Sequence, residues 1–346
     1  MAIHFTNPGR IKVFLKDPKK KGILKILKEV FVLWTTRKEV PMYYFKHLYK
    51  KEVKNYKDYL STDLNNRIQR SPKLNKQEYT SILNNKLNFA LYCEKHKLAT
   101  PKLIGHNFSN SFFLGNGICE ISTLNQLMQT FEAVFQSTPT KAIFFRPLSL
   151  YGGKGCFKLS KENFQKKLQL EYENLMSGNY AHTEVIAQHP EINAIYSKSI
   201  NTLRILTHME NGEVDIITSS MRFGAKGNVV DNTSSGGLTI GINQKNGTLK
   251  QTAYFDIEFG GEQTNKHPDT DFVLQNFKIP YYKEACKLVK NASKHIPNGM
   301  VGWDVAITPY GPILIEGNED PSLYISDILE GGLLKNSKML KMIARI

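Results

Sequence analysis

The feature that most constrains the fold is a pair of apolar segments near the end of the chain, each carrying one central carboxylate. Residues 301–308 (VGWDVAIT) and 312–316 (PILIE) flank Pro309-Tyr310-Gly311, a turn sequence, which predicts a β-hairpin. If these three residues form the turn, with Gly311 in the left-handed position, Asp304 lies opposite Glu316. Side chains alternate along a strand, so Asn318 shares the face of Glu316.

Facing carboxylates repel each other in a sheet unless a cation lies between them. Mg²⁺ prefers oxygen ligands and is usually held by one or two carboxylates together with substrate phosphates. The hairpin therefore predicts a magnesium site with three ligands, namely Asp304, Glu316 and Asn318. The alternative is a pair of solvated carboxylates at a sheet edge.

A second predicted hairpin carries a glycine-rich tip. Residues 141–149 form one strand and 156–159 a short returning strand, joined by the mobile loop Tyr151-Gly152-Gly153-Lys154-Gly155. Backbone N–H groups of such a loop can close over an anion, and Lys154 and Arg146 add positive charge. An ordinary hairpin turn is the alternative. The chain has neither a GxxxxGK[ST] nor a GxGxxG motif, so P-loop and Rossmann folds find no support.

A third hairpin is predicted over residues 202–210 and 213–221, because Asn211-Gly212 suits a two-residue type I′ turn. Arg204 lies in this hairpin and Arg222 directly follows it, and arginine suits bidentate binding of a phosphate or carboxylate. Structural salt bridges are the alternative. Helices are expected at Ser81–His96 and Tyr281–Lys294, and a loop at 256–271.

The positive charge of the chain is concentrated at its start. Residues 1–80 hold 19 Lys/Arg and 7 Asp/Glu, which accounts for +12 of the total of +15. A nucleic-acid partner is therefore not expected, since the rest of the chain is nearly balanced. Within this region residues 19–34 predict a basic amphipathic helix, which lies either on an anionic membrane surface or, as we favour, on the catalytic core. Residues 43–59 mix tyrosines with lysines, which favours a solvated helix face over a grip on a phosphorylated ligand.

The four cysteines are far apart and form no CxxC pair, so we expect them to be reduced and mostly buried. Residues 1–10 are polar and do not resemble a secretory signal. Both observations favour a cytoplasmic protein, with peripheral attachment to the inner face of the membrane as the consequence of the membrane alternative.

The order of the motifs is more specific than any one of them. In sequence they are Asn85-Lys86, the glycine loop, Thr183-Glu184-Val185-Ile186 before His189-Pro190, NTLRI, SSMRFG, VDN, SSGG, GWD and LIEGN. This order resembles the ATP-grasp superfamily, and within it the sugar-transfer-associated branch, over about residues 80 to 330. The resemblance implies an α+β fold of two subdomains that clasp ATP, at 81–190 and 191–346, preceded by a basic, mainly helical region at 1–80.

The resemblance also implies roles for single residues. Asp304 would bind one Mg²⁺, Glu316 would bridge two, and Asn318 would hold the second. The ATP side would comprise Lys86 and Arg146 on the phosphates, the lid of Gly152, Gly153, Lys154 and Gly155, and the adenine hinge of Glu184, Val185 and Ile186. The acyl-phosphate and substrate side would comprise Arg204, Arg222, Asp231, Asn232, Gly236 and Gly237. Two positions depart from the family, because lysine is usual at 146 and an acidic residue is expected at 183.

The expected function is an ATP- and Mg²⁺-dependent ligase that joins a carboxylate to an amine through an acyl phosphate and releases ADP and phosphate. Its substrate would be a sugar acid or an amino acid, as a small molecule or on a glycan precursor, in surface-polysaccharide biosynthesis. An amino-acid or peptide ligase and a kinase share all of these motifs. A catalytically silent, basic protein bound to membrane or nucleic acid is the alternative from another class.

Overall fold

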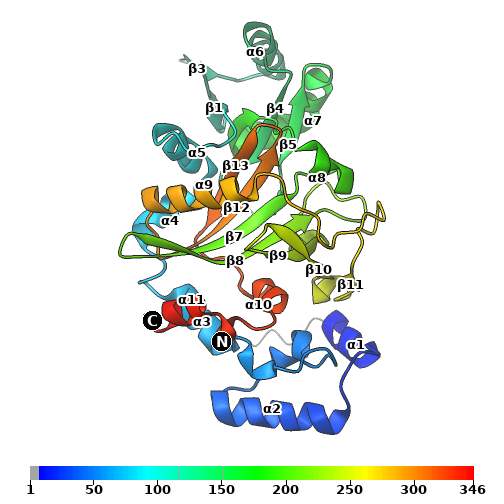
Figure 1. Cartoon of the computed structure of the whole chain (residues 1–346). Coiled ribbons are helices and arrows are strands. Elements are labelled where there is room, and N and C mark those ends of the chain that lie inside the picture. Colours follow the sequence, from blue (N-terminus) through cyan, green and yellow to red (C-terminus); the bar gives the residue numbers. More distant parts are fainter. Residues whose placement is uncertain (1–7, 116, 151) are drawn as a thin grey trace.

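The strands of the chain form two antiparallel sheets (Figure 1). The structure, a computed structural model, describes residues 8–115, 117–150 and 152–346. Tyr151 of the glycine loop and residues 1–7 lie outside the described residues. Within the described chain, one sheet has six strands, all between residues 103 and 184, and the other has seven, all between 202 and 318.

The smaller sheet has the strand order β3-β2-β1-β6-β4-β5. Its strands are β1 (Leu103–Phe108), β2 (Ser111–Leu114), β3 (Gly117–Glu120), β4 (Ala142–Pro147), β5 (Phe157–Ser160) and β6 (Asn179–Glu184). Helices α6 (Leu124–Ser137) and α7 (Phe164–Ser177) pack on it around Phe112, Phe131 and Phe145. β4 and β5 confirm the hairpin predicted around the glycine loop.

The larger sheet has the strand order β11-β10-β9-β8-β7-β12-β13. Its strands are β7 (Thr202–Glu210), β8 (Glu213–Phe223), β9 (Leu238–Asn243), β10 (Thr248–Phe255), β11 (Gln263–Thr264), β12 (Met300–Thr308) and β13 (Gly311–Asn318). A helix confirms the expectation near residue 281, namely α9 (Tyr282–His295), and it covers one face of this sheet. The other face is covered by α3 (Thr62–Arg70), α10 (Tyr324–Glu330), η5 (Leu333–Lys335) and α11 (Ser337–Ile343).

Shorter helices lie between these elements. α8 (Pro190–Ile195) follows β6, η3 (Thr233–Ser235) precedes β9, and η4 (Ile257–Phe259) lies in the segment expected to be a loop. The turn at Asn211-Gly212 is confirmed, because Glu210 pairs with Glu213 and both turn residues have positive φ, 51° and 81°.

The helix expected at Ser81–His96 is in fact two helices, α4 (Gln77–Leu83) and α5 (Lys86–Lys95). Asn85 separates them because its side-chain oxygen accepts hydrogen bonds from the N–H groups of Leu87 and Asn88 and so begins a new helix. Both helices contribute to the core of the larger sheet, through Leu83 and Phe89 among others. The division at residues 81 and 191 stays a prediction.

The turn of the last hairpin differs from the prediction, although Asp304 does pair with Glu316. Thr308 pairs with Gly311, so the turn has two residues rather than three. A bulge then changes the register, because Asp304 pairs with Glu316 while the next residue, Val305, pairs with Leu314. The bulge adds the residue that was expected in the turn, and it is this bulge that places the two carboxylates opposite each other.

The N-terminal region forms its own apolar cluster at the lower end of Figure 1. It consists of α1 (Pro8–Lys16), α2 (Ile23–Arg37), the π-helical turn η1 (Tyr44–Leu48) and η2 (Tyr56–Asp58). The prediction of a solvated face at 43–59 is wrong for the tyrosines, because Tyr44 and Tyr49 are fully buried. Their hydroxyl groups remain hydrogen-bonded, to Glu29 at 2.7 Å and to Asp17 at 2.9 Å, which makes burial of these polar rings possible.

Helix α2 packs on this cluster rather than on the sheets, so the expectation that we favoured, a helix lying on the catalytic core, is wrong. Its inner face buries Ile26, Glu29 and Leu33, and Lys21 Nζ donates to the Glu29 carboxylate at 2.6 Å. Burial lowers the pKa of Lys21, and the adjacent Glu29 opposes this effect. The ion pair therefore fixes the start of the helix against η1.

Of the cysteines, Cys93 is buried and the other three are half-buried, so the expectation that most are buried is wrong. All four are free thiols. Among the described helices, α2 included, we find none with the length and apolar character that a bilayer crossing requires.

We predict that Glu29→Gln destabilises the N-terminal region. The substitution leaves the buried Lys21 ammonium without its anionic partner, and breaking a buried pair in this way costs about 3–5 kcal/mol. Chemical unfolding and limited proteolysis of residues 8–60 measure the effect. Lys28→Gln on the exposed side of the same helix is the control and should change the free energy of unfolding by less than about 0.5 kcal/mol. Equal effects of the two substitutions would contradict this role of the ion pair.

Candidate functional site

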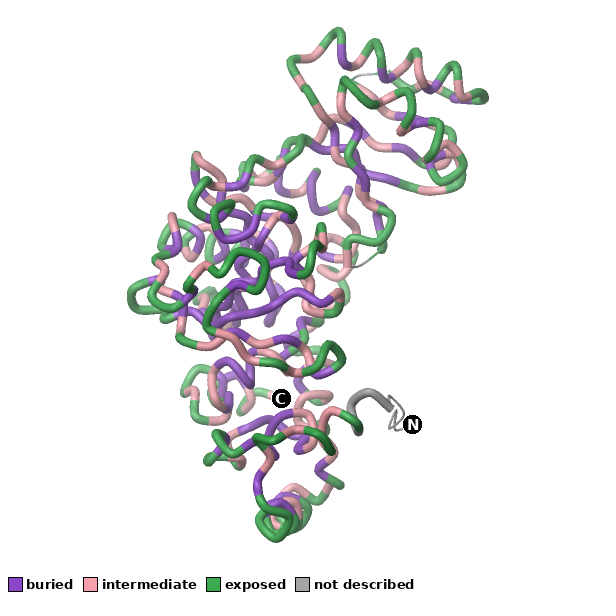
Figure 2. Tube along the Cα trace, turned by 90° about the vertical axis from the view of Figure 1, so that its right-hand side faces the viewer, coloured by how far each residue is buried: buried purple, intermediate pink, exposed green. Residues whose placement is uncertain are grey.

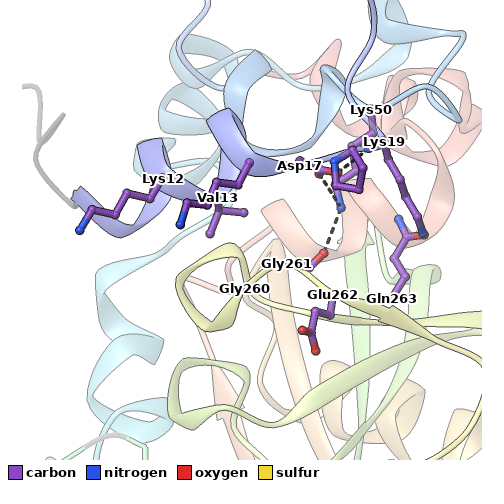
Figure 3. Close-up of a pocket in the computed structure, with 11 residues that line it drawn as sticks. Lys12, Val13, Asp17, Lys19, Lys50, Gly260, Gly261, Glu262 and Gln263 are labelled. Atoms are coloured by element: carbon purple, nitrogen blue, oxygen red, sulfur yellow. Dashed lines mark hydrogen bonds and ion pairs between the residues drawn. The ribbon is translucent and has the colours of Figure 1, made fainter.

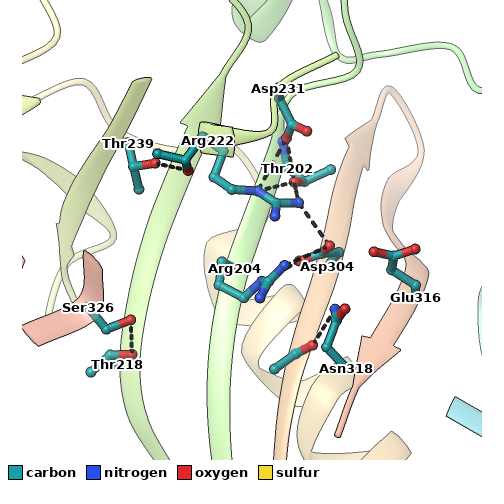
Figure 4. A network of polar contacts seen from close by, with 12 residues as sticks. Thr202, Arg204, Thr218, Arg222, Asp231, Thr239, Asp304, Glu316, Asn318 and Ser326 are labelled. Atoms are coloured by element: carbon teal, nitrogen blue, oxygen red, sulfur yellow. Dashed lines mark hydrogen bonds and ion pairs between the residues drawn. The ribbon is translucent and has the colours of Figure 1, made fainter. Parts of the chain in front are cut away.

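Three adjacent strands position the acidic centre of the site. β12 lies between β7 and β13, and in this register Asp304 is flanked by Arg204 on one side and Glu316 on the other (Figure 4). Asp304 is only 2% exposed. The alternative of two solvated edge carboxylates is therefore wrong for Asp304, and a buried carboxylate requires compensation by positive charge or hydrogen bonds.

Two arginines provide that compensation. Arg204 contacts both carboxylate oxygens of Asp304, from Nε at 2.5 Å and from Nη2 at 3.1 Å, and Arg222 Nη2 contacts Oδ2 at 2.8 Å. Burial alone would raise the pKa of Asp304, but Arg204 and Arg222 outweigh it and hold the pKa below its usual value. Asp304 thus shares its carboxylate between two guanidinium groups, which favour its charged form.

Arg222 is itself held in place by a second carboxylate. Asp231 lies 3.5 Å from Arg222 Nε and accepts hydrogen bonds from the N–H and hydroxyl of Thr202 at 2.9 and 2.5 Å. The Thr202 hydroxyl oxygen in turn accepts from Arg222 at 2.5 and 3.1 Å. Burial disfavours the charged guanidinium, yet Asp231 and Asp304 together raise the pKa of Arg222. In this structure Asp231 therefore orients Arg222.

The loop after Asp231 approaches the same strands closely. Gly237 N–H donates to the Asn232 carbonyl at 3.0 Å, and a Cβ at position 237 would collide with the backbone of Asp231. Gly236 has φ of +89°, a conformation that glycine adopts without strain. These glycines let residues 231–237 fold tightly beside β9.

Glu316 faces the smaller sheet. Arg146, from β4 of the smaller sheet, lies 3.4 Å from the Glu316 carboxylate and donates to the Ile315 carbonyl at 3.2 Å. Burial and the adjacent Asp304 raise the pKa of Glu316, while Arg146 and Lys86 oppose this. Lys86 donates to the Leu150 carbonyl at 2.6 Å, just before the glycine loop, and burial followed by the proximity of Arg146 lowers its pKa. The positive charges of Lys86 and Arg146 thus lie near the carboxylate pair.

The residues present suit a magnesium ion that also binds phosphate. Asp304, Glu316 and Asn318 offer side-chain oxygen atoms as metal ligands. Asn318 Nδ2 donates a hydrogen bond to the Gly302 carbonyl at 3.1 Å, which directs the side-chain oxygen of Asn318 away from that backbone. The described residues include no group of three His, Cys, Asp or Glu side chains that would hold a metal alone. The remaining ligands would come from water and phosphate, as Mg²⁺ prefers.

The glycine loop, between β4 and β5 of the smaller sheet, reaches the segment between β8 and β9 of the larger sheet. Gly152, Gly153 and Gly155 have φ of 71°, 72° and 70°, so the loop depends on glycine at all three positions. A Cβ added at Gly153 would lie 2.7 Å from Val230 Cγ1, which shows how closely the loop approaches the segment before Asp231. Lys154 is exposed on this loop.

The expected hinge, Glu184 to Ile186, follows β6 and leads into α8. Glu184 N–H donates to the Lys102 carbonyl at 2.9 Å, and His189 N–H donates to the Ile307 carbonyl of β12 at 2.8 Å. These residues therefore connect the two sheets. Glu184 and Val185 are exposed and lie outside the ion-pair network.

Thr202 and Gln188 also shape the site, although neither was predicted from the sequence. Gln188 is buried, donates to the Tyr196 and Ser199 carbonyls, and accepts from Asn201 N–H at 2.6 Å, which fixes the entry into β7. A signal existed for Thr202 alone, since it stands two residues before Arg204 and shares its face of the strand.

Comparison with known proteins gives one family. Residues 65–343 match the family described as Sugar-transfer associated ATP-grasp, so the match begins earlier than the motifs indicated. No protein with a curated description matches the sequence.

Several solved structures resemble the chain at low sequence identity. D-alanyl-alanine synthetase A from Vibrio cholerae O1 biovar eltor shares 13% identity over 78% of this chain and 67% of that chain, with a TM-score of 0.45. N5-carboxyaminoimidazole synthase from Aspergillus clavatus, in complex with ADP and 5-aminoimidazole ribonucleotide, shares 11% over 79% and 54%, with a TM-score of 0.47. VanG D-Ala:D-Ser ligase from Enterococcus faecalis shares 10% over 78% and 63%, with a TM-score of 0.46. The chain thus spans between about half and two thirds of the length of these structures.

We predict that the two facing carboxylates contribute differently to stability. Asp304→Asn leaves the buried Arg222 and the half-buried Arg204 without their shared anion and should lower the free energy of unfolding by about 3–5 kcal/mol. Glu316→Gln removes a like charge facing Asp304 and should cost less than about 1 kcal/mol. Urea unfolding of both variants without added metal tests this difference. Equal losses would contradict the assignment of Asp304 as the shared anion.

Proposed function

Because the chain belongs to the sugar-transfer associated ATP-grasp family, we propose that it is an ATP- and Mg²⁺-dependent ligase that joins a carboxylate to an amine. Family membership confirms the predicted α+β ATP-grasp fold. The observation that carries the proposal is that the Asp304–Glu316 pair of the larger sheet lies near two cations, Lys86 at the start of α5 and Arg146 on β4 of the smaller sheet. Such an arrangement of carboxylates and cations suits a metal–triphosphate.

On the nucleotide side, Lys86 and Arg146 would bind phosphate oxygens and the backbone N–H groups of residues 152–155 would cover them. Glu184, Val185 and Ile186 would border the adenine at the connection between the sheets. Asp304, Glu316 and Asn318 would hold Mg²⁺, whose charge neutralises the phosphates during transfer. The number of ions, two by family resemblance, belongs to the proposal.

On the substrate side, Arg204 and Arg222 would act after phosphoryl transfer. Attack of the substrate carboxylate on the γ-phosphate gives an acyl phosphate and ADP, and attack of the amine on the acyl carbon then expels phosphate. The second step forms an oxyanion, which fixed cations stabilise without reorganisation. Arg222 is already fixed by Asp231 and Thr202. Asn232, Gly236 and Gly237, on the loop that follows Asp231, would border the substrate.

The family description supports a substrate connected with sugar transfer, and hence a sugar acid or an amino acid carried on a surface-polysaccharide precursor. This part of the proposal rests on the family description alone. An amino-acid or peptide ligase and a kinase would use the same nucleotide side, so the nature of the product distinguishes them.

We predict that enzyme, Mg·ATP and a carboxylate substrate yield a hydroxamate and ADP when hydroxylamine replaces the amine. Hydroxylamine traps an acyl phosphate because it attacks the activated acyl carbon. Sugar acids and amino acids are the first compounds to screen, by ADP release. Glu316→Gln, which should fold normally, is the control and should lower turnover by about a hundredfold.

Three other results would contradict the ligase. A stable phosphorylated product without hydroxamate indicates a kinase. AMP with pyrophosphate indicates different chemistry. Failure of the folded protein to bind Mg·ATP favours the catalytically silent alternative.

We predict that the contact between Gly153 and Val230 limits closure of the glycine loop. Gly153→Ala adds both a left-handed alanine and a clash with Val230, whereas Gly152→Ala adds only the first, because nothing lies within 4 Å of its Cβ. Turnover should fall by about tenfold more in Gly153→Ala than in Gly152→Ala. Adding Val230→Ala to Gly153→Ala should abolish this difference, because it removes the clash. A difference that persists in the double variant would place the effect outside this contact.

A further inference from the structure

The outer side of helix α2 carries an apolar stripe that the fold does not use. Leu24, Leu27, Phe31 and Trp34 recur at spacings of three and four residues and are 81%, 58%, 62% and 54% exposed. Ile23 extends the stripe at the start of the helix and is 65% exposed. The inner face already packs on the N-terminal cluster through Ile26 and Leu33, so the stripe is additional to what holds the helix in place.

The helix lies at one end of the molecule. Figure 1 shows α2 below the larger sheet and farthest from the smaller one, and the view from the side in Figure 2 again places it at the end of the molecule with its exposed residues outward. A flat surface could therefore contact the stripe along the whole helix without contacting either sheet.

The charges around the stripe have one sign. Residues 17–40 contain three carboxylates, and none is exposed: Glu29 pairs with Lys21, Asp17 accepts from Tyr49, and Glu39 accepts from the N–H groups of Thr62 and Asp63. Four lysines of the same segment are exposed, namely Lys19, Lys25, Lys28 and Lys38. The fold thus turns the acidic groups inward and leaves an apolar and basic surface.

More lysines lie beside the start of this helix. A cavity of about 510 Å³ between α1 and residues 260–263 is lined by four lysines, Lys12, Lys16, Lys19 and Lys50, and by two carboxylates, the half-buried Asp17 and the exposed Glu262 (Figure 3). Lys50 is engaged with the Gly261 carbonyl at 3.0 Å, whereas Lys12, Lys16 and Lys19 are exposed. These groups extend the basic surface along the same end of the molecule.

We propose that α2 binds an anionic lipid bilayer, lying in the plane of the interface. Leu24, Leu27, Phe31 and Trp34 enter the boundary between headgroups and acyl chains, and the lysines contact lipid phosphates. An apolar stripe with tryptophan, bordered within residues 17–40 by exposed lysines and by no exposed carboxylate, complements a lipid surface of negative charge better than it complements a protein groove. With 15 residues the helix is too short to cross the bilayer. The proposal does not depend on the proposed reaction.

Sedimentation with lipid vesicles tests this proposal on the full chain without nucleotide. We expect the protein to pellet at low salt with vesicles containing about one third phosphatidylglycerol, to stay in solution with phosphatidylcholine alone, and to be released at about 0.5 M salt. Leu27→Gln with Phe31→Gln should weaken binding by about tenfold or more, and Lys25→Gln with Lys28→Gln by about tenfold. Ile118→Gln with Leu170→Gln, at equally exposed positions of the smaller lobe, is the control and should bind as wild type.

The two tryptophans make a second readout specific. Trp303 is fully buried whereas Trp34 is 54% exposed, so a shift of tryptophan emission to shorter wavelength on adding vesicles reports Trp34. Trp34→Phe should abolish the shift and retain binding. The proposal is overturned if wild type stays in solution at low salt, or if the stripe variant binds as well as the control. It is equally overturned if the stripe instead mediates a dimer that sedimentation velocity detects without lipid.

Discussion

The structure of the site depends on one buried carboxylate that two guanidinium groups share. Asp304 lies on β12, Arg204 on the adjacent strand β7, and Arg222 on β8 beyond it. A slip of β12 by one residue would turn Asp304 to the opposite face of the sheet and leave both cations without the anion that they share. The ion pairs and the strand register therefore stabilise each other, and together they fix the positions of Glu316 and Asn318 beside Asp304.

The bulge in β13 connects this centre to the other lobe. Because β13 is the edge strand and Ile315 has no partner residue on β12, the Ile315 carbonyl is able to accept a hydrogen bond from Arg146. The same arginine lies beside Glu316, so a single side chain of the smaller sheet contacts both the backbone and the carboxylate of the larger one. Positive charge at position 146 serves this contact, and the planar guanidinium, with several donors, makes both interactions at once, which a lysine at this position would do less well.

The N-terminal region is attached by polar contacts to segments that pack on the larger sheet. Asp327 of α10 accepts from Leu60 N–H at 2.9 Å, Asn55 donates to the Gly331 carbonyl at 2.7 Å, and Lys50 donates to the Gly261 carbonyl. Helix α2 is thus held in a defined orientation relative to the larger sheet. A surface that binds α2 consequently orients the site around Asp304 as well, because folded structure connects α2 to the larger sheet.

The sequence by itself determined the hairpins, the opposed pair Asp304–Glu316 and the family, because turn residues, strand alternation and motif order are local properties. The pairing was predicted correctly for the wrong reason, since a three-residue turn and a two-residue turn with a bulge give the same register at Asp304, and only the packed sheet selects the second. Tertiary structure alone decided that Arg222 is held by Asp231 and Thr202, and that the tyrosines at 44 and 49 are buried. These outcomes depend on which distant groups satisfy a buried charge or hydroxyl, and a sequence pattern contains no information on partners that only folding brings together.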